Sequence, residues 1–231
     1  MLAASVRELL GVPAALLTDD EAIALALDPA QNPLLGEALN LTDHSKLTRA
    51  LHHPAYTFRK KLSHTADSQD QRHRMTPASR PLLSAYLTEE PDYVTPKLLA
   101  GAGEAERLYR ETMNRTWESI RALGRLGVPD EFRAYLLPNA VALRFTESSD
   151  LAALRHKHAM RLCFNAQEEI WQASVDEALQ IREAEPRIGR WLLPPCGHRA
   201  RAGAKPICPE GERFCGVLVW RQDPADYHRL F

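Results

Sequence analysis

Residues 69–86 read "QDQRHRMTPASRPLLSAY", and this stretch places Arg72, His73 and Arg74 side by side, with Arg80 close behind. Neighbouring cations repel one another unless an anion or an aromatic ring lies among them. The chain as a whole has 29 basic and 30 acidic residues and a formal net charge of -1, so the cluster is not part of a generally basic surface. It is therefore either a solvated loop or a local anion site.

The basic cluster has the donor groups that a diphosphate needs. A guanidinium offers a planar fork of N–H donors that matches phosphate oxygens, and an imidazole beside it adds another donor. On a strand Arg72 and Arg74 would share one face, whereas on a helix the three side chains would fan out. No glycine-rich loop of the known nucleotide-binding types accompanies the cluster. The residues alone leave both the solvated loop and the diphosphate clamp open.

Length and composition narrow the class of protein. With 231 residues, of which 45% are hydrophobic, the chain can form one sizeable core and a small appended module. No segment approaches the roughly 18 apolar residues of a membrane-spanning helix, and the N-terminal stretch lacks a basic leader followed by an unbroken apolar run. We therefore expect a cytoplasmic protein without membrane contact. The balanced charge also argues against a nucleic-acid-binding module, the alternative that a basic cluster and a cysteine-containing tail would otherwise favour.

Apolar spacing and helix-ending residues predict the order of the secondary structure. Apolar patches separated by glycine and proline in residues 2–35 predict two short helices. Apolar residues at steps of mostly three or four predict an amphipathic helix over 104–126, and Asp150 can cap a long helix over 151–182. The other predicted elements are a strand over 55–63, a short helix over 129–137 and an extended run over 140–148.

The predicted long helix carries a second group of polar residues. His158, Arg161, Asn165 and Glu168 are separated by three, four and three residues, so on a continuous helix they form one stripe. An inward-facing Arg161 would need a partner, because a buried unpaired charge is expensive. The alternative is that Arg161 and Glu168 form an ordinary exposed ion pair.

The basic cluster is one of several short motifs that occur in order along the chain. "LHHPAYTF" (51–58) precedes it, Gln69 stands three residues before Arg72, and "EFRAYLLP" (131–138) and "RLCFNAQEEIW" (161–171) follow it. Several weak motifs in one order and spacing are more specific than any one of them. Together they resemble the motifs of the flavin-dependent thymidylate synthases, and the resemblance covers roughly residues 47–182.

The resemblance implies an α+β fold in which a twisted antiparallel sheet is flanked by long helices. It also implies a homotetramer with active sites between subunits, FAD as cofactor, and reductive methylation of a uracil nucleotide (dUMP to dTMP). Methylenetetrahydrofolate and NADPH would be the co-substrates. We expect three segments: an N-terminal helical segment (1–36), the family-like domain (37–186) and a C-terminal extension containing cysteine and histidine (187–231).

The resemblance also assigns roles to individual residues. Arg161 would face the pyrimidine, where a fixed cation can stabilise negative charge on the ring carbonyls. The reduced flavin would carry the redox chemistry. The residues expected to bind the cofactor are Arg72, His73, Arg74, His156 and Asn165, and those expected to bind the substrate are Gln69, Ser84 and Arg133.

The chain departs from the family motif on the substrate side. Pro77 stands where the family has a serine, the following glutamate is missing, and Ser84-Ala85-Tyr86 lacks the arginine of the family's Ser-x-Arg-Tyr. Ala134 occupies the position of a second phosphate-binding arginine, and Arg133 lies one residue early, about 100° around a helix. Arg80 could replace a missing arginine. The alternative functions are therefore an FAD-binding relative acting on a different pyrimidine-type substrate, or a degenerate flavin-binding partner subunit.

The C-terminal tail lies outside the resemblance. Cys196, His198, Cys208 and Cys215 have the number and kind of ligands that a closed tetrahedral zinc site needs, although their spacing lacks paired Cys-x-x-Cys turns. Free buried thiols or a disulfide are the alternatives. We expect Cys163 to be a small core residue, and "GVLVW" (216–220) to form a short strand.

Overall fold

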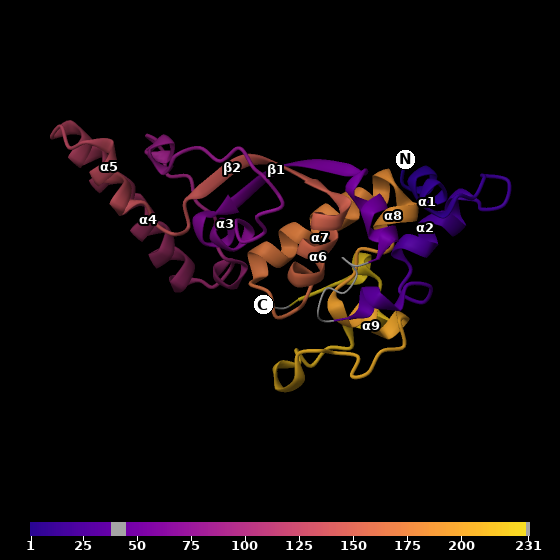
Figure 1. The fold of residues 1–231 in the computed structure, drawn as a ribbon. Coiled ribbons are helices and arrows are strands. Elements are labelled where there is room, and N and C mark those ends of the chain that lie inside the picture. The colour runs from indigo at the N-terminus through magenta and orange to yellow at the C-terminus, as the bar shows by residue number, and fades with distance from the viewer. Residues whose placement is uncertain (38–44, 230–231) are drawn as a thin grey trace. The chain divides into compact units, whose positions relative to one another are not determined.

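The structure, a computed structural model, describes residues 1–37 and 45–229. In it the chain divides into two compact units (Figure 1). The first unit consists of Met1–Thr57 and the described residues from Ser148 onward, and the second is Phe58–Glu147. The expected division into segments at residues 36 and 186 stays a prediction, and parts of its second and third segments (38–44 and 230–231) lie outside the described residues.

The sheet has two antiparallel strands, β1 (Ala55–Ser63) and β2 (Ala142–Asp150). Burial alternates along much of both strands, as it does when one face of a sheet covers a core. The buried positions include two charged residues, Lys60 and Glu147, among apolar neighbours. The predicted strand over 55–63 is confirmed, and so is the mixed α+β class, although the described residues are mostly helical.

The second unit adds its helices to this sheet. In the long helix Met113, Trp117 and Ile120 are buried, as the spacing of apolar residues predicts. The predicted helix over 104–126 is confirmed. The predicted short helix begins one residue later than expected and tightens into a 3-10 turn after Arg133. The helices of this unit are α3 (His64–Asp70), α4 (Glu104–Arg125) and α5 (Asp130–Arg133).

The first unit is helical apart from the strand ends. Its two N-terminal helices confirm the prediction for residues 2–35, and the second begins with a capping box formed by Thr18 and Glu21. Trp171 and Leu154 are among the side chains that fill its core. The helices of this unit are α1 (Leu2–Leu10), α2 (Asp19–Leu27), α6 (Leu151–Arg161), α7 (Glu168–Ala184), α8 (Pro186–Gly189) and α9 (Pro195–Arg201).

The single long helix predicted over 151–182 is wrong, because the chain leaves the helix after Arg161 and starts a new one at Glu168. The start of α6 is as predicted, since the Asp150 carboxylate accepts a hydrogen bond from the Ala153 N–H (2.8 Å). The break has a local cause. The Gln167 side chain caps α7 by accepting from the Ile170 N–H (3.1 Å), and two glutamates follow in the first turn, where the helix dipole favours negative charge.

The C-terminal tail contains little regular structure. The predicted strand at 216–220 is wrong: Gly216 has a φ of 79°, outside the range of a strand, and a 3-10 turn at Val219–Arg221 follows. No residue from 199 to 218 is buried. This part of the tail is therefore not held by a core of its own.

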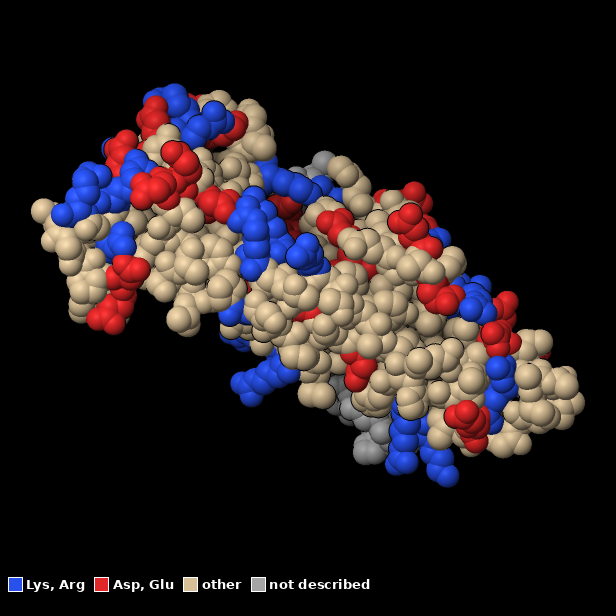
Figure 2. Space-filling model, turned by 90° about the horizontal axis from the view of Figure 1, so that it is seen from above, with Lys and Arg blue, Asp and Glu red and all other residues tan. Residues whose placement is uncertain are grey.

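Acidic and basic side chains are intermixed on the face of the molecule shown in Figure 2. This agrees with the balanced composition of the chain. None of the described helices has the length and apolar character that crossing a membrane requires.

Candidate functional site

The basic cluster lies in a turn that follows α3, and not on a strand or within a helix. The His73 N–H donates to the Asp70 carbonyl (3.0 Å), and the Thr76 hydroxyl donates to the His73 carbonyl (2.6 Å). Arg72 and Arg74 are exposed, whereas His73 is partly buried. The turn thus fixes its backbone internally and leaves both guanidinium groups accessible to an anion.

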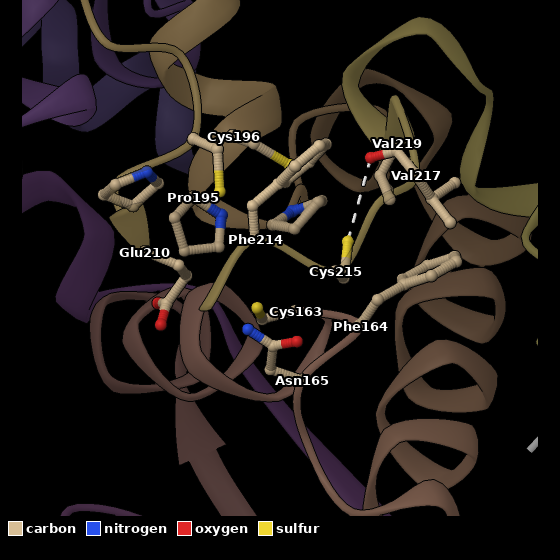
Figure 3. A pocket seen from close by; sticks show the side chains of 13 residues that line it. Cys163, Phe164, Asn165, Pro195, Cys196, Glu210, Phe214, Cys215, Val217 and Val219 are labelled. Carbon is tan, nitrogen blue, oxygen red and sulfur yellow. Dashed lines mark hydrogen bonds between the residues drawn. The ribbon is translucent and has the colours of Figure 1, made fainter. Parts of the chain in front are cut away.

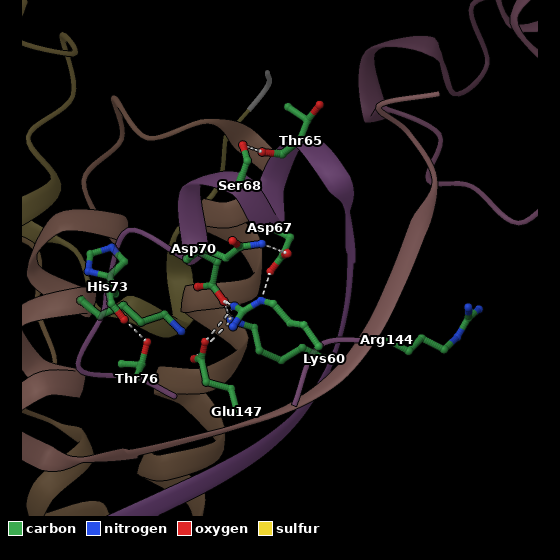
Figure 4. A network of polar contacts seen from close by, with 12 residues as sticks. Lys60, Thr65, Asp67, Ser68, Asp70, His73, Thr76, Arg144 and Glu147 are labelled. Atoms are coloured by element: carbon green, nitrogen blue, oxygen red, sulfur yellow. Dashed lines mark hydrogen bonds and ion pairs between the residues drawn. The ribbon is translucent and has the colours of Figure 1, made fainter. Parts of the chain in front are cut away.

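A network of buried charges lies directly behind this turn (Figure 4). The Lys60 ammonium donates to the Asp70 carboxylate (2.8 Å) and lies 3.5 Å from a Glu147 oxygen. The two carboxylates are almost fully buried, with side-chain exposures of 0% and 1%. Charges so far from water need partners at contact distance, because desolvation costs several kcal/mol for each ion.

Asp67 and Arg80 close the loop that carries the cluster. The Asp67 carboxylate accepts from the Gln71 amide (2.6 Å) and from the Arg80 guanidinium (2.7 Å). The same guanidinium donates to Asp70 (3.2 Å). Because Gln71 comes before the basic residues and Arg80 after them, one buried carboxylate on α3 holds both ends of the loop.

Arg80 is therefore a structural residue in this unit. Besides its two aspartate partners it lies 3.6 Å from a Glu147 oxygen, and its guanidinium stacks over the Phe145 ring at 4.3 Å. The expectation that Arg80 could replace a missing phosphate-binding arginine is wrong for this conformation, because its charge is already engaged by three carboxylates. Lys60 and Arg80 thus share the task of neutralising three buried carboxylates.

The three residues expected on the substrate side also lie in the second unit. Gln69 is in the last turn of α3, and Ser84 is in a 3-10 helix (Leu83–Tyr86). The Tyr86 hydroxyl anchors that helix to β2 by accepting from the Arg144 N–H (3.0 Å). Arg133 pairs with Asp130 on its own short helix and packs against α4. The structure therefore gives Arg133 a partner within its own helix.

The remaining expected site residues lie in the first unit. His156 is exposed on α6 and lines a cavity of about 220 Å³, and Arg161 is partly buried in the last turn of that helix. Asn165 is in the link between α6 and α7, where its amide donates to the Arg213 carbonyl (2.6 Å). The predicted stripe of four polar residues is wrong, because the helix ends between its second and third members.

His158, the first member of that stripe, is instead part of a buried contact between α6 and α7. Its Nε2 lies 3.0 Å from Glu177, and the Lys157 ammonium lies 3.2 Å from the other oxygen of the same carboxylate. All three residues are buried. This pairing satisfies the Glu177 charge inside the unit, which assigns His158 to the core.

The expected zinc ligands are not assembled. No group of three or more Cys, His, Asp or Glu side chains in the described part of the chain is arranged to hold a metal ion. His198 lines the same cavity as His156, and no cysteine lines that cavity. Burial, with Arg155 and Arg201 nearby, lowers the pKa of His198 to about 3. The same two cations would also repel a metal ion, so His198 is wrong as a ligand.

All four cysteines of the chain line one small cavity in the first unit (Figure 3). Cys163 comes from the link between α6 and α7, Cys196 from α9, and Cys208 and Cys215 from the tail. Sequence reasoning missed Cys163, because its place in the predicted helix gave no sign of what lies opposite. The only indication in the sequence was that the chain has four cysteines in all, the number of ligands in a tetrahedral site, and Cys163 is the one outside the tail.

The similarity of the chain to known proteins extends over parts of both units. A model of the family described as thymidylate synthase complementing protein matches residues 29–187, more than half of the chain. The matched range contains the basic turn, the buried network and α6 with Arg161. It also contains Cys163 but not the other three cysteines.

Three flavin-dependent thymidylate synthases illustrate the similarity. The chain is 28% identical over 192 residues to that of Geobacter sulfurreducens, covering 78% of this chain and 74% of the relative. It is 31% identical over 187 residues to that of Nitratidesulfovibrio vulgaris, covering 74% and 72%. It is 28% identical over 151 residues to that of Sulfurisphaera tokodaii, covering 63% and 57%.

The buried network predicts unequal effects at two adjacent lysines. Lys60→Met should lower the free energy of unfolding by about 3–5 kcal/mol, because it removes the cation closest to the buried Asp70 carboxylate and leaves Arg80 to balance more negative charge. Lys61, next along the strand, is half exposed and lies 3.8 Å from Asp92, so Lys61→Met should change it by less than about 1 kcal/mol. Urea unfolding of both variants measures the difference, and equal effects would show that the network does not stabilise this unit.

Proposed function

The chain belongs to the thymidylate synthase complementing protein family, and on that basis we propose that it is a flavin-dependent enzyme that methylates a uracil nucleotide reductively. The reaction would convert dUMP to dTMP, with methylenetetrahydrofolate as carbon donor and NADPH as reductant. The proposal takes its substrate class from the relatives, which are named flavin-dependent thymidylate synthases.

The observation that carries the proposal is the exposed basic turn on its buried support. Two guanidinium groups and an imidazole, presented by Arg72, His73 and Arg74, supply the planar donors that suit the diphosphate of FAD. The turn is fixed by its own hydrogen bonds and by the network through Asp67 and Asp70, so its backbone is held in place before a ligand arrives. These residues therefore fit the cofactor that the family resemblance implies.

Each of the remaining site residues has one proposed task. FAD, when bound, would supply the redox chemistry. Arg161 would stabilise the negative charge that develops on the pyrimidine carbonyls as carbon 5 becomes nucleophilic. His156 and Asn165 would contact the cofactor, and Gln69, Ser84 and Arg133 would contact the substrate.

A second candidate function is favoured because the arginines expected on the substrate side are already paired with carboxylates. Arg80 is engaged by three carboxylates and Arg133 by Asp130, so neither stands ready for a substrate phosphate. Two missing phosphate contacts would each remove about 1.5–3 kcal/mol of binding energy. The chain would then be an FAD-binding relative that acts on a different pyrimidine-type substrate, or a degenerate flavin-binding subunit that works with a partner.

We also propose a cytoplasmic homotetramer with active sites between subunits. The second unit exposes large apolar side chains that a neighbouring subunit would cover. They include Leu82, Leu126, Phe132 and Tyr135, which are 57–87% exposed.

The first experiment asks whether the purified chain binds FAD and turns over dUMP. The protein as isolated, or after incubation with FAD, should show flavin absorption. With NADPH and methylenetetrahydrofolate it should release the hydrogen from carbon 5 of dUMP. Light scattering on the same sample gives the number of subunits. Flavin binding without hydrogen release would select the second candidate, and absence of flavin binding would refute both.

Arg72→Ala tests the proposed cofactor clamp. Loss of a charge-assisted contact to the diphosphate should weaken FAD binding about ten- to a hundredfold, measured by fluorescence titration of the flavin. Arg107→Ala is a matched control, because Arg107 is an exposed arginine paired with Glu111 on α4. Its affinity for FAD should equal that of the unaltered chain. If both variants bind FAD equally well, the basic turn is not the clamp.

Arg161→Gln tests the proposed catalytic cation. Removing a charge that acts on the transition state should reduce kcat by about 10²–10³-fold, whereas the dissociation constant of FAD should stay within about twofold. Rapid-quench kinetics at saturating dUMP measures kcat separately from KM. A change confined to KM would assign Arg161 to substrate binding only.

A further inference from the structure

The four cysteines meet although they lie far apart in the sequence. They come from three separate segments of the first unit, yet all line one cavity of about 20 Å³. None of them is in a disulfide. The lining is otherwise largely apolar, formed by proline, phenylalanine and valine side chains. Four soft ligands around a dry space of this size match the donor set of a closed metal site.

Backbone N–H groups lie close to two of these cysteine sulfurs. The Asn165 N–H donates to the Cys163 sulfur, and the Gly197 N–H donates to the Cys196 sulfur. Such N–H donors accompany metal-bound thiolates, because they stabilise the negative charge on sulfur. Burial has the larger effect, since it raises the pKa of Cys163 and raises that of Cys196 to about 12.

A positive charge lies close enough to balance a thiolate cluster. Arg229 stacks over the Trp171 ring at 5.1 Å and donates to the Ala166 carbonyl (2.8 Å). From that place its guanidinium is close enough to Cys163 and Cys215 to interact electrostatically with them. Four thiolates and one divalent ion carry two net negative charges, so a fixed cation at this position lowers the cost of forming the cluster.

The segment that carries two of the cysteines is held at few points by the rest of the unit. No residue from 199 to 218 is buried, and such a long unsupported loop is uncommon in a compact unit. Hydrogen bonds to the carbonyls of Pro206 and Arg213 tie it down at two points. Glycines at positive φ follow Cys208 and Cys215 closely, at Gly211 (56°) and Gly216 (79°), so the backbone can turn the thiols inward.

We propose that Cys163, Cys196, Cys208 and Cys215 together bind one thiophilic divalent metal ion, and that this ion fastens the C-terminal loop to the link between α6 and α7. The thiols surround the cavity without yet forming a coordination set in the described structure, so binding draws the loop inward by a small movement. Each thiol loses one proton, and four metal–sulfur bonds form without oxidation or reduction.

The metal content of the full chain tests the proposal. Protein prepared under reducing, oxygen-free conditions should contain about one zinc or iron ion per chain after dialysis. Its four thiols should react with a thiol reagent only after a chelator removes the metal. The metal-free chain should take up Co²⁺ and gain the visible absorption of tetrahedral cobalt thiolate. A chain with four free thiols that binds neither Zn²⁺ nor Co²⁺ overturns the proposal, and so does one whose native state holds a disulfide.

Variants identify the ligands. Cys163→Ser should reduce the metal content at least about tenfold, because a closed site of four ligands loses one of them. His198→Gln should leave it unchanged, since His198 lies in the other cavity. The opposite result would replace the proposed set by one containing His198. If Cys163→Ser fails to fold, thiol protection and Co²⁺ binding by the unaltered chain still decide the question.

Discussion

The contact between Lys60 and Asp70 is the constraint on which the basic turn depends. Both groups are buried, and at a separation of 2.8 Å each charge neutralises the other. The lysine belongs to β1 and the aspartate to the end of α3, so the pair fixes where the helix ends relative to the strand before it. Arg80, on the segment that follows the turn, donates to the same Asp70 carboxylate. The exposed basic turn is therefore supported by an interior that is rich in carboxylates.

Much of the second unit could be predicted from local patterns. The period of apolar residues predicted α4, and the alternation in "AYTFRKKLS" predicted β1, because both patterns reflect burial on one face. The burial of Lys60 was readable in that alternation, since it shares its phase with Phe58 and Leu62. The partners of Lys60 could not be predicted, because Asp70 and Glu147 come close to it only in the folded chain. Long-range pairing of charges leaves no periodic trace in a sequence.

The first unit shows where local patterns mislead. Apolar spacing continues through residues 162–167, so a single helix was the natural expectation. The break arises because Gln167 and the two following glutamates start a helix more favourably than they would continue one. The resemblance to the family assigned roles to site residues, and these assignments stay predictions. It could not foresee that the Arg80 guanidinium would be engaged by three carboxylates. It also gave no reason to join Cys163 to the tail, because residues of the tail lie outside the shared motifs.

The basic turn is held from behind, through Gln71 and Arg80, and its outward arginines take no part in that support. Mutations at Arg72 and Arg74 should therefore affect ligand binding and leave the stability of the fold nearly unchanged. Mutations at Asp67 or Asp70 are filtered by folding before any ligand is tested. During evolution, single substitutions at Arg72 or Arg74 can therefore change the ligand preference of the turn, while Asp67 and Asp70 are conserved by the requirement for folding.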